Sequence, residues 1–132
     1  GSLESRLAQA LFAMPGVRGV AFGDGFAAAA MRGSEHNDPY LDARGRTASN
    51  HAGGINGGIS NGNDLVIRVA VKPTSSIARA QETFDFEAGK MTSLETAGRH
   101  DACFALRTPV IVEALTAIVL ADEVLLAGKE RA

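Results

Sequence analysis

Apolar residues recur every three or four positions at the start of the chain, which is the spacing of one face of a helix. This pattern predicts a helix from Leu3 to Met14, ended by Pro15-Gly16. The following residues, Val17 to Phe22, form a short apolar stretch with a preference for β-structure and predict a strand. Asp24 is then placed to cap a short alanine-rich helix from Gly25 to Arg32.

In the middle of the chain, a mostly polar stretch is followed by a stretch in which large apolar residues recur at every second position. Residues 34–48 contain few hydrophobic side chains, so we expect them to form a surface excursion. From Leu65 to Lys72, large apolar residues recur at every second position, which makes this the clearest strand in the sequence. Leu65, Ile67, Val69 and Val71 alternate with Val66, Arg68, Ala70 and Lys72. The segment from Gln81 to Thr96, with a turn near Gly89, predicts a β-hairpin.

A long apolar helix is predicted near the end of the chain, beginning at Thr108-Pro109 and ending at Gly128. It is apolar on most sides, which favours burial between layers. We expect its buried face to consist of Val112, Leu115, Val119 and Leu120, widened by Ile111 and Ile118. These elements together predict an α+β fold with helices packed on a mostly antiparallel sheet.

Length and composition limit the classes of protein. With 132 residues, the chain is expected to form a single domain over 1–132, with Gly1-Ser2 interpreted as a cloning remnant. A net charge of −2 argues against a nucleic-acid partner. The single cysteine, Cys103, is expected to be a small buried side chain in a reducing compartment. Since neither a signal peptide nor a membrane-length apolar run is visible, we expect a cytoplasmic protein with no membrane partner.

The segment from Ser49 to Gly62 contains two Gly-Gly pairs and carries little side-chain bulk. Glycine allows positive φ and a close approach of the backbone, so the N–H groups of this loop can bind a ligand themselves. The segment lacks the Gly-Lys-Ser/Thr ending of a phosphate-binding loop, and a strand follows it instead of a helix. The alternative interpretation is an irregular hairpin that needs several positive φ angles.

Two further segments could bind an anion. Lys72, Pro73, Thr74, Ser75 and Ser76 place one positive charge and three hydroxyls at a strand end, which suits a phosphate or a flavin side chain. A simple turn after an edge strand is the alternative.

The second segment is Arg99-His100-Asp101, which combines a guanidinium suited to anions with a carboxylate suited to proton transfer. A surface ion pair is its alternative. His36 and His51 have no second histidine or cysteine at metal-ligand spacing, so no metal site is expected.

The order of these motifs resembles chorismate synthase over roughly residues 3–126. The resemblance is carried by five stretches: Gly23 to Phe26, Arg32 to Asp38, Ser49 to Gly54, Lys72 to Ser76, and Gly98 to Asp101. Chains of that family are far longer, and this sequence resembles only their C-terminal portion. The resemblance implies a βαβ sandwich in which helices lie between sheets.

The resemblance also implies an activity and a set of site residues. The family converts 5-enolpyruvylshikimate 3-phosphate to chorismate by a 1,4-elimination of phosphate that requires reduced flavin mononucleotide (FMN). By resemblance, Arg99 binds the anionic substrate and Asp101 is the catalytic acid–base partner of the flavin. The implied flavin-binding residues are Pro15, Gly16, Gly57, Lys72, Pro73, Thr74, Ser75, Ser76 and Arg99.

The resemblance is compatible with two hypotheses about the function of this chain. The chain is either a piece of a chorismate synthase, whose substrate is a phosphorylated anionic small molecule, or a non-catalytic truncated relative that at most binds flavin. The family's catalytic histidines belong to the portion that this chain does not resemble, so we expect no turnover by this chain alone. Apolar surface left uncovered by the missing portion predicts a homo-oligomer.

Overall fold

The computed structural model describes residues 1–98 and 101–129 and divides the chain into two compact units. Unit 1 consists of residues 1–72 and 110–132, and unit 2 consists of residues 73–109. The described elements are α1 (Leu3–Phe12), β1 (Val17–Phe22), the 3₁₀ helix η1 (Gly25–Ala30), α2 (Gly33–His36), β2 (Ile55–Asn56), β3 (Ile59–Ser60), β4 (Ile67–Val71), β5 (Gln81–Asp85), β6 (Lys90–Leu94), the 3₁₀ helix η2 (Phe104–Arg107) and α3 (Pro109–Lys129). Helices combined with antiparallel strand pairs confirm the predicted α+β class.

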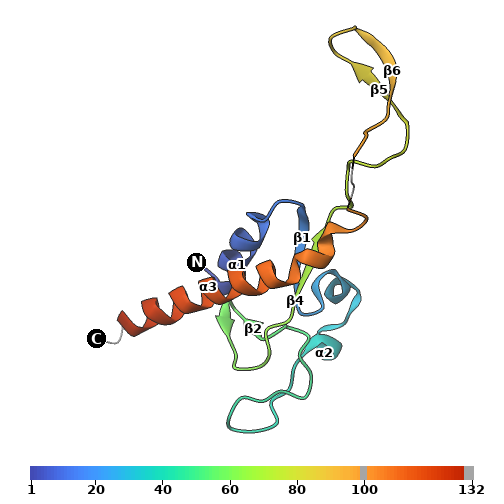
Figure 1. Cartoon of the computed structure of the whole chain (residues 1–132). Helices are drawn as coiled ribbons and strands as arrows, with labels where there is room; N and C mark the ends of the chain where they lie inside the picture. Colours follow the sequence, from blue (N-terminus) through green and yellow to red (C-terminus); the bar gives the residue numbers. More distant parts are fainter. Residues whose placement is uncertain (99–100, 130–132) are drawn as a thin grey trace. The chain divides into compact units, whose positions relative to one another are not determined.

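Unit 1 is built around the antiparallel pair β1–β4 (Figure 1). Val17 lies opposite Val71 and Phe22 opposite Ile67, with a bulge between Val17 and Gly19. Helix α1 packs against β1. The Ser2 hydroxyl caps α1 by accepting a hydrogen bond from the Ser5 N–H at 3.2 Å, so this residue has a structural role in the described fold.

The core of unit 1 is small and aliphatic. Leu3 and Leu7 of α1, Ile55 of β2 and Val119 of α3 form one buried cluster, as the helical spacing predicts for the two leucines. Arg6 joins α1 to α3 on the surface by ion pairs with Asp122 and Glu123. The described helices include none that is both long enough and apolar enough to span a membrane.

Helix α3 differs from its prediction. Its inward face includes Val119 and Leu120, as expected, but Ile111 and Ile118 are 45% and 64% exposed and do not widen the buried face. The prediction that this helix is buried between layers is therefore wrong for the described residues of unit 1, which cover one side of it. The reason is that burial depends on what packs against a helix, which its own composition does not specify.

The short helix after β1 also differs from its prediction. It is a 3₁₀ helix that ends at Ala30, and the Asp24 side chain does not cap it. The carboxylate of Asp24 instead lies 2.6 Å from the imidazole Nδ1 of His51, so a distant residue competes successfully for the capping group. Gly33 begins the next helix, α2.

Unit 2 contains the predicted hairpin, formed by β5 and β6. Thr83 lies opposite Thr92 and Asp85 opposite Lys90, pairs that stabilise an antiparallel ribbon. The rings of Phe84 and Phe86 meet edge to face with their centroids 5.5 Å apart. Cys103, expected to be buried, is exposed at the start of η2.

The aliphatic cluster predicts a large effect of truncating Leu7, whose side chain is fully buried. We expect Leu7→Ala to lower the free energy of unfolding by about 2–5 kcal/mol, because it removes buried methyl groups and leaves a cavity. Urea denaturation followed by circular dichroism measures this change. Phe26→Ala, at a side chain that is 93% exposed, is the control and should change stability by less than about 0.5 kcal/mol. Equal effects of the two substitutions would contradict this core.

Candidate functional site

The glycine-rich segment forms a hairpin followed by an irregular loop, as one of the two interpretations predicted. β2 and β3 pair antiparallel, with Ile55 opposite Ser60. The turn between them consists of Gly57 and Gly58, both at positive φ (58° and 84°). At Gly57 no described atom lies within 4 Å of the position that a Cβ would occupy, so its backbone is open to approach from outside.

The first Gly-Gly pair is packed inside the protein. A Cβ on Gly53 would lie 2.3 Å from the backbone nitrogen of Gly23, which leaves no room for any side chain. The Gly23 N–H in turn donates to the Val66 carbonyl at 2.9 Å. Close backbone contact therefore fixes the start of the loop against the end of β1.

The Asp38 carboxylate holds the same loop from another side. It accepts hydrogen bonds from the backbone N–H groups of His51 (2.8 Å) and Ala52 (2.9 Å) and from the Ser49 hydroxyl (2.8 Å). Burial raises the pKa of the Asp38 carboxyl, but these three donors outweigh it and hold the pKa below its ordinary value. Asp38 is therefore ionised at neutral pH and binds a backbone segment eleven to fourteen residues away.

His51 carries a second set of contacts. Its Nδ1 lies 2.6 Å from a carboxylate oxygen of Asp24, and its carbonyl accepts the Asp24 N–H at 2.8 Å. The His36 ring lies beside it at 5.7 Å between centroids. Asn50 closes the loop by accepting from the Gly54 N–H at 2.8 Å and donating to the Asp64 carbonyl at 2.9 Å. We call the contacts of Asp24, Asp38, Asn50 and His51 the loop clamp.

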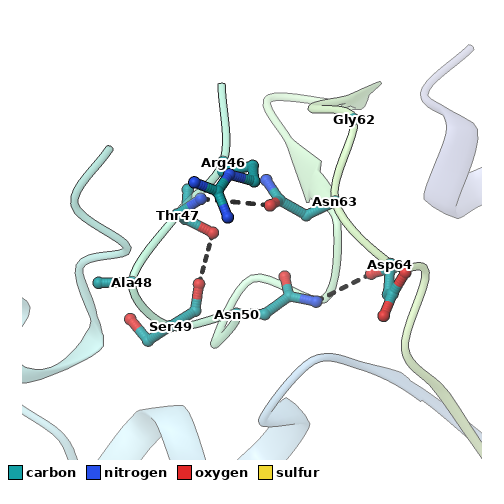
Figure 2. A pocket seen from close by; sticks show the side chains of 8 residues that line it. All are labelled: Arg46, Thr47, Ala48, Ser49, Asn50, Gly62, Asn63 and Asp64. Atoms are coloured by element: carbon teal, nitrogen blue, oxygen red, sulfur yellow. Dashed lines mark hydrogen bonds between the residues drawn. The ribbon is translucent and has the colours of Figure 1, made fainter. Parts of the chain in front are cut away.

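A polar hollow of about 470 Å³ lies beside the loop clamp (Figure 2). Thr47 donates from its hydroxyl to the Ser49 carbonyl at 2.5 Å, and its N–H donates to the Asn63 side chain at 3.3 Å. The bond to Asn63, together with the bond from Asn50 to the Asp64 carbonyl, connects the two chain segments that form the walls of the hollow, so we interpret it as structural. Its lining residues, none of them predicted site residues, are Arg46, Thr47, Ala48, Ser49, Asn50, Gly62, Asn63 and Asp64.

Two predicted site residues meet at the end of the β1–β4 pair. The Lys72 N–H donates to the Gly16 carbonyl at 2.8 Å, and Gly16, next to Pro15, adopts a φ of 90°. The Lys72 ammonium makes no ion pair within the described residues. Its charge is therefore available to an anionic ligand.

Two other predicted site residues, Thr74 and Asp101, are in contact within unit 2. The Thr74 hydroxyl donates to the Asp101 carbonyl at 2.8 Å, which brings the hydroxyl segment to the predicted acid–base residue. The Asp101 carboxylate pairs with the Arg107 guanidinium at 3.0 Å, a contact that sequence reasoning missed. Arg107 lies six residues away with no motif to mark it. Arg99 and His100 lie outside the described residues. Within the described residues, Pro73, Ser75 and Ser76 make no hydrogen bond or ion pair with Thr74, Asp101 or Arg107.

Among the described residues, no group of three or more His, Cys, Asp or Glu side chains is arranged to hold a metal ion. The acidic and imidazole groups of the loop clamp are engaged with each other and with backbone N–H groups.

Comparison with known proteins gives one consistent result. A family model described as chorismate synthase matches residues 1–125. The chorismate synthase of Chitinophaga pinensis is 56% identical over 125 residues, which cover 95% of this chain and 38% of the relative. That of Archaeoglobus fulgidus is 50% identical over 130 residues, which cover 97% of this chain and 36% of the relative. The chain thus spans little more than a third of the length of these relatives.

A solved crystal structure of chorismate synthase also resembles the fold. It aligns with a TM-score of 0.52 at 40% sequence identity, over 55% of this chain and 22% of that chain.

The loop clamp predicts a pH-dependent effect of Asp38→Asn. Since the pKa of Asp38 is lowered by folding, its contribution to stability is present above its unfolded pKa of about 3.9 and is lost as the pH falls through the folded value. We expect Asp38→Asn to cost about 1–3 kcal/mol at pH 7, because an amide cannot accept all three bonds, and clearly less at pH 3.

Urea denaturation at the two pH values measures this difference. Asp64→Asn is the matched control, since the Asp64 carboxylate makes no hydrogen bond to any described residue and only its backbone carbonyl is bonded, to Asn50. A destabilisation by Asp38→Asn that is the same at both pH values would show that the carboxylate charge does not hold the loop.

Proposed function

The chain belongs to the chorismate synthase family, and from this premise we propose that it supplies one wall of a chorismate synthase active site, the wall that binds reduced FMN. The reaction of the whole enzyme is the elimination of phosphate from 5-enolpyruvylshikimate 3-phosphate to give chorismate. The observation that carries the proposal is the ammonium of Lys72, which follows a strand anchored to Gly16 and has no ion-pair partner in the part of the chain that the structure describes.

Reduced FMN, when bound, would supply electron density to the substrate and make departure of its phosphate easier. The residues of this chain fit such a ligand in two respects. Lys72 offers a positive charge that is held at a fixed strand end, and Gly57 offers a backbone that is accessible from outside. Thr74, Ser75 and Ser76 add hydroxyl donors, and Pro73 fixes the chain direction between them and Lys72.

We also propose roles for the remaining predicted residues, unit by unit. Pro15 and Gly16 border Lys72 through the Gly16 carbonyl. Asp101 is proposed as the proton-transfer residue, and its carboxylate pairs with the Arg107 guanidinium at 3.0 Å. Arg99 is proposed to bind the substrate anion and the flavin.

This chain alone is proposed to lack turnover, because it matches only 38% and 36% of the length of these two relatives. That difference also favours the second candidate, a non-catalytic relative that folds, self-associates and at most binds flavin. The two candidates share the flavin-binding wall and differ in whether the remainder of an enzyme is supplied. A homo-oligomer and a cytoplasmic location belong to the proposal in both cases.

The role of Lys72 predicts the outcome of an FMN titration. We expect Lys72→Met to weaken FMN binding at least about tenfold, because one charge-assisted contact of about 1.5 kcal/mol or more is lost. Quenching of flavin fluorescence measures Kd. Lys90→Met, in the β5–β6 hairpin, is the control and should leave Kd unchanged.

Riboflavin, which lacks the phosphate, tests which part of the ligand Lys72 contacts. If the ammonium binds the phosphate, riboflavin should bind the original protein and Lys72→Met equally well. An unchanged Kd for FMN in Lys72→Met would refute the assigned role, and an absence of FMN binding by the unaltered chain would refute the flavin-binding wall itself.

A further inference from the structure

The end of β2 and the turn that follows it contain a chemically reactive dipeptide, Asn56-Gly57. The side-chain amide of an asparagine can be attacked by the backbone nitrogen of the next residue, and glycine leaves that nitrogen unhindered because it has no Cβ. The sequence contains two such dipeptides, Asn56-Gly57 and Asn61-Gly62. The contacts of the two asparagines differ, and this difference indicates which of them reacts in the folded chain.

Asn56 and Gly57 have free the groups that the reaction uses. Both residues are exposed. The Gly57 N–H, which must lose its proton before the nitrogen attacks, donates to no acceptor in the part of the chain that the structure describes. The Asn56 Nδ2, which must leave as ammonia, likewise donates to no described acceptor. The turn is therefore open to the water that the reaction consumes.

The one hydrogen bond of the Asn56 side chain favours the reaction. Its oxygen accepts from the Asn61 Nδ2 at 2.6 Å. Attack on the Asn56 Cγ places negative charge on this oxygen, and a donor that already points at the oxygen stabilises that charge.

Asn61, in contrast, is held in place by three hydrogen bonds. Its oxygen accepts from the N–H and the Nδ2 of Asn63 at 2.9 Å and 3.0 Å, and its Nδ2 donates to Asn56. Rotation of the Asn61 side chain toward the Gly62 nitrogen would break these bonds, each of which stabilises the resting geometry. The fold therefore protects Asn61 and leaves Asn56 the more reactive of the two.

We propose that Asn56 is a site of spontaneous deamidation. The Gly57 nitrogen gives up its proton to solvent and bonds to the Asn56 Cγ. The Cγ–Nδ2 bond then breaks, its electron pair stays with the departing nitrogen, and ammonia leaves after taking up a proton from solvent. One water molecule opens the resulting cyclic imide at either carbonyl, which gives aspartate or isoaspartate. Nothing is oxidised or reduced in these steps.

The modification alters the main chain at one defined place. In the isoaspartate form the chain runs through the side-chain carbon of residue 56 and is one carbon longer. Ile55 on one side is 2% exposed within the core cluster, and the Gly58 carbonyl on the other side accepts the Leu3 N–H at 2.9 Å. Since both neighbours are fixed, the added carbon displaces the backbone of Gly57. Both products also add a negative charge to a chain of net charge −2.

Mass spectrometry of the native chain tests the proposal. The chain is incubated in mildly alkaline buffer, and fragmentation of the tryptic peptide 47–68, which contains both dipeptides, locates the conversion of amide to acid. We expect conversion at Asn56 to be at least about fivefold faster than at Asn61, because rotation of the Asn61 side chain breaks more hydrogen bonds. Labelling by an isoaspartyl O-methyltransferase should detect isoaspartate at position 56. A sample digested without incubation gives the background.

The same measurement in urea isolates the contribution of the fold. Both asparagines precede a glycine, so in the unfolded chain they should lose ammonia at similar rates. Equal rates in the native chain, or a faster reaction at Asn61, would overturn the proposal. An Asn56 that stays intact in the native chain but reacts in urea would also overturn it, by showing that the hairpin protects this residue.

One consequence rests on the proposed binding of FMN at Gly57 and is measured separately. Anion exchange isolates the deamidated chain by its added charge, and we expect this form to bind FMN at least tenfold more weakly than the unmodified chain. Asn56→Gln, incubated in parallel, is the matched control and should keep its affinity. Equal affinities of the modified and unmodified chains would overturn this consequence. An absence of FMN binding by the unmodified chain would refute it together with the flavin-binding wall, and the deamidation rates would be unaffected.

Discussion

The arrangement of the candidate site depends on one carboxylate. Asp38 accepts hydrogen bonds from two backbone N–H groups and one hydroxyl of residues 49–52. These residues begin the glycine-rich segment from Ser49 to Gly62, which has little side-chain bulk with which to pack. Glycine-rich backbone loses more conformational entropy on folding than other sequence. Charge-assisted hydrogen bonds, which are stronger than neutral ones, offset that cost. The chain can therefore hold an open loop with accessible backbone without covering it with hydrophobic side chains.

Holding the first Gly-Gly pair rigidly has a consequence for the second. Gly53 is fixed by close contact with Gly23, and the hairpin then carries Gly57 away from the packed region to a position open to approach. In our proposal, reduced FMN contacts an accessible backbone at Gly57 and a positive charge held in a fixed place at Lys72. The loop clamp provides the first, and the β1–β4 pair, through the Gly16–Lys72 hydrogen bond, provides the second.

Much of the fold could be predicted because the relevant signals are local. The leucine spacing in α1, the period-two pattern before Lys72 and the turn at Gly89 each specify an element from neighbouring residues, and the structure has each of them. The need for positive φ in the glycine-rich segment was also visible from its composition. The family could be recognised because its motifs occur in a fixed order.

The predictions that were wrong or incomplete concern residues whose contacts depend on a distant part of the chain or on a partner that is absent from the structure. Asp24 looked like a helix cap, but His51, which is 27 residues away, takes its carboxylate. Arg107 pairs with Asp101 although no spacing rule connects them. Ile111 and Ile118 of α3 were predicted to widen a buried face but are exposed, since composition indicates that a surface prefers burial but not whether a partner is present.

The central claim is that the loop clamp shapes the glycine-rich segment in this chain alone, without the rest of the family's polypeptide. Native-state hydrogen exchange of the His51 and Ala52 amides, followed by nuclear magnetic resonance, tests it most directly, because both amides donate to Asp38. Our account predicts that both exchange at least tenfold more slowly than unstructured amides. Exchange at the unstructured rate would contradict it and would mean that the segment acquires its shape only within the longer enzyme.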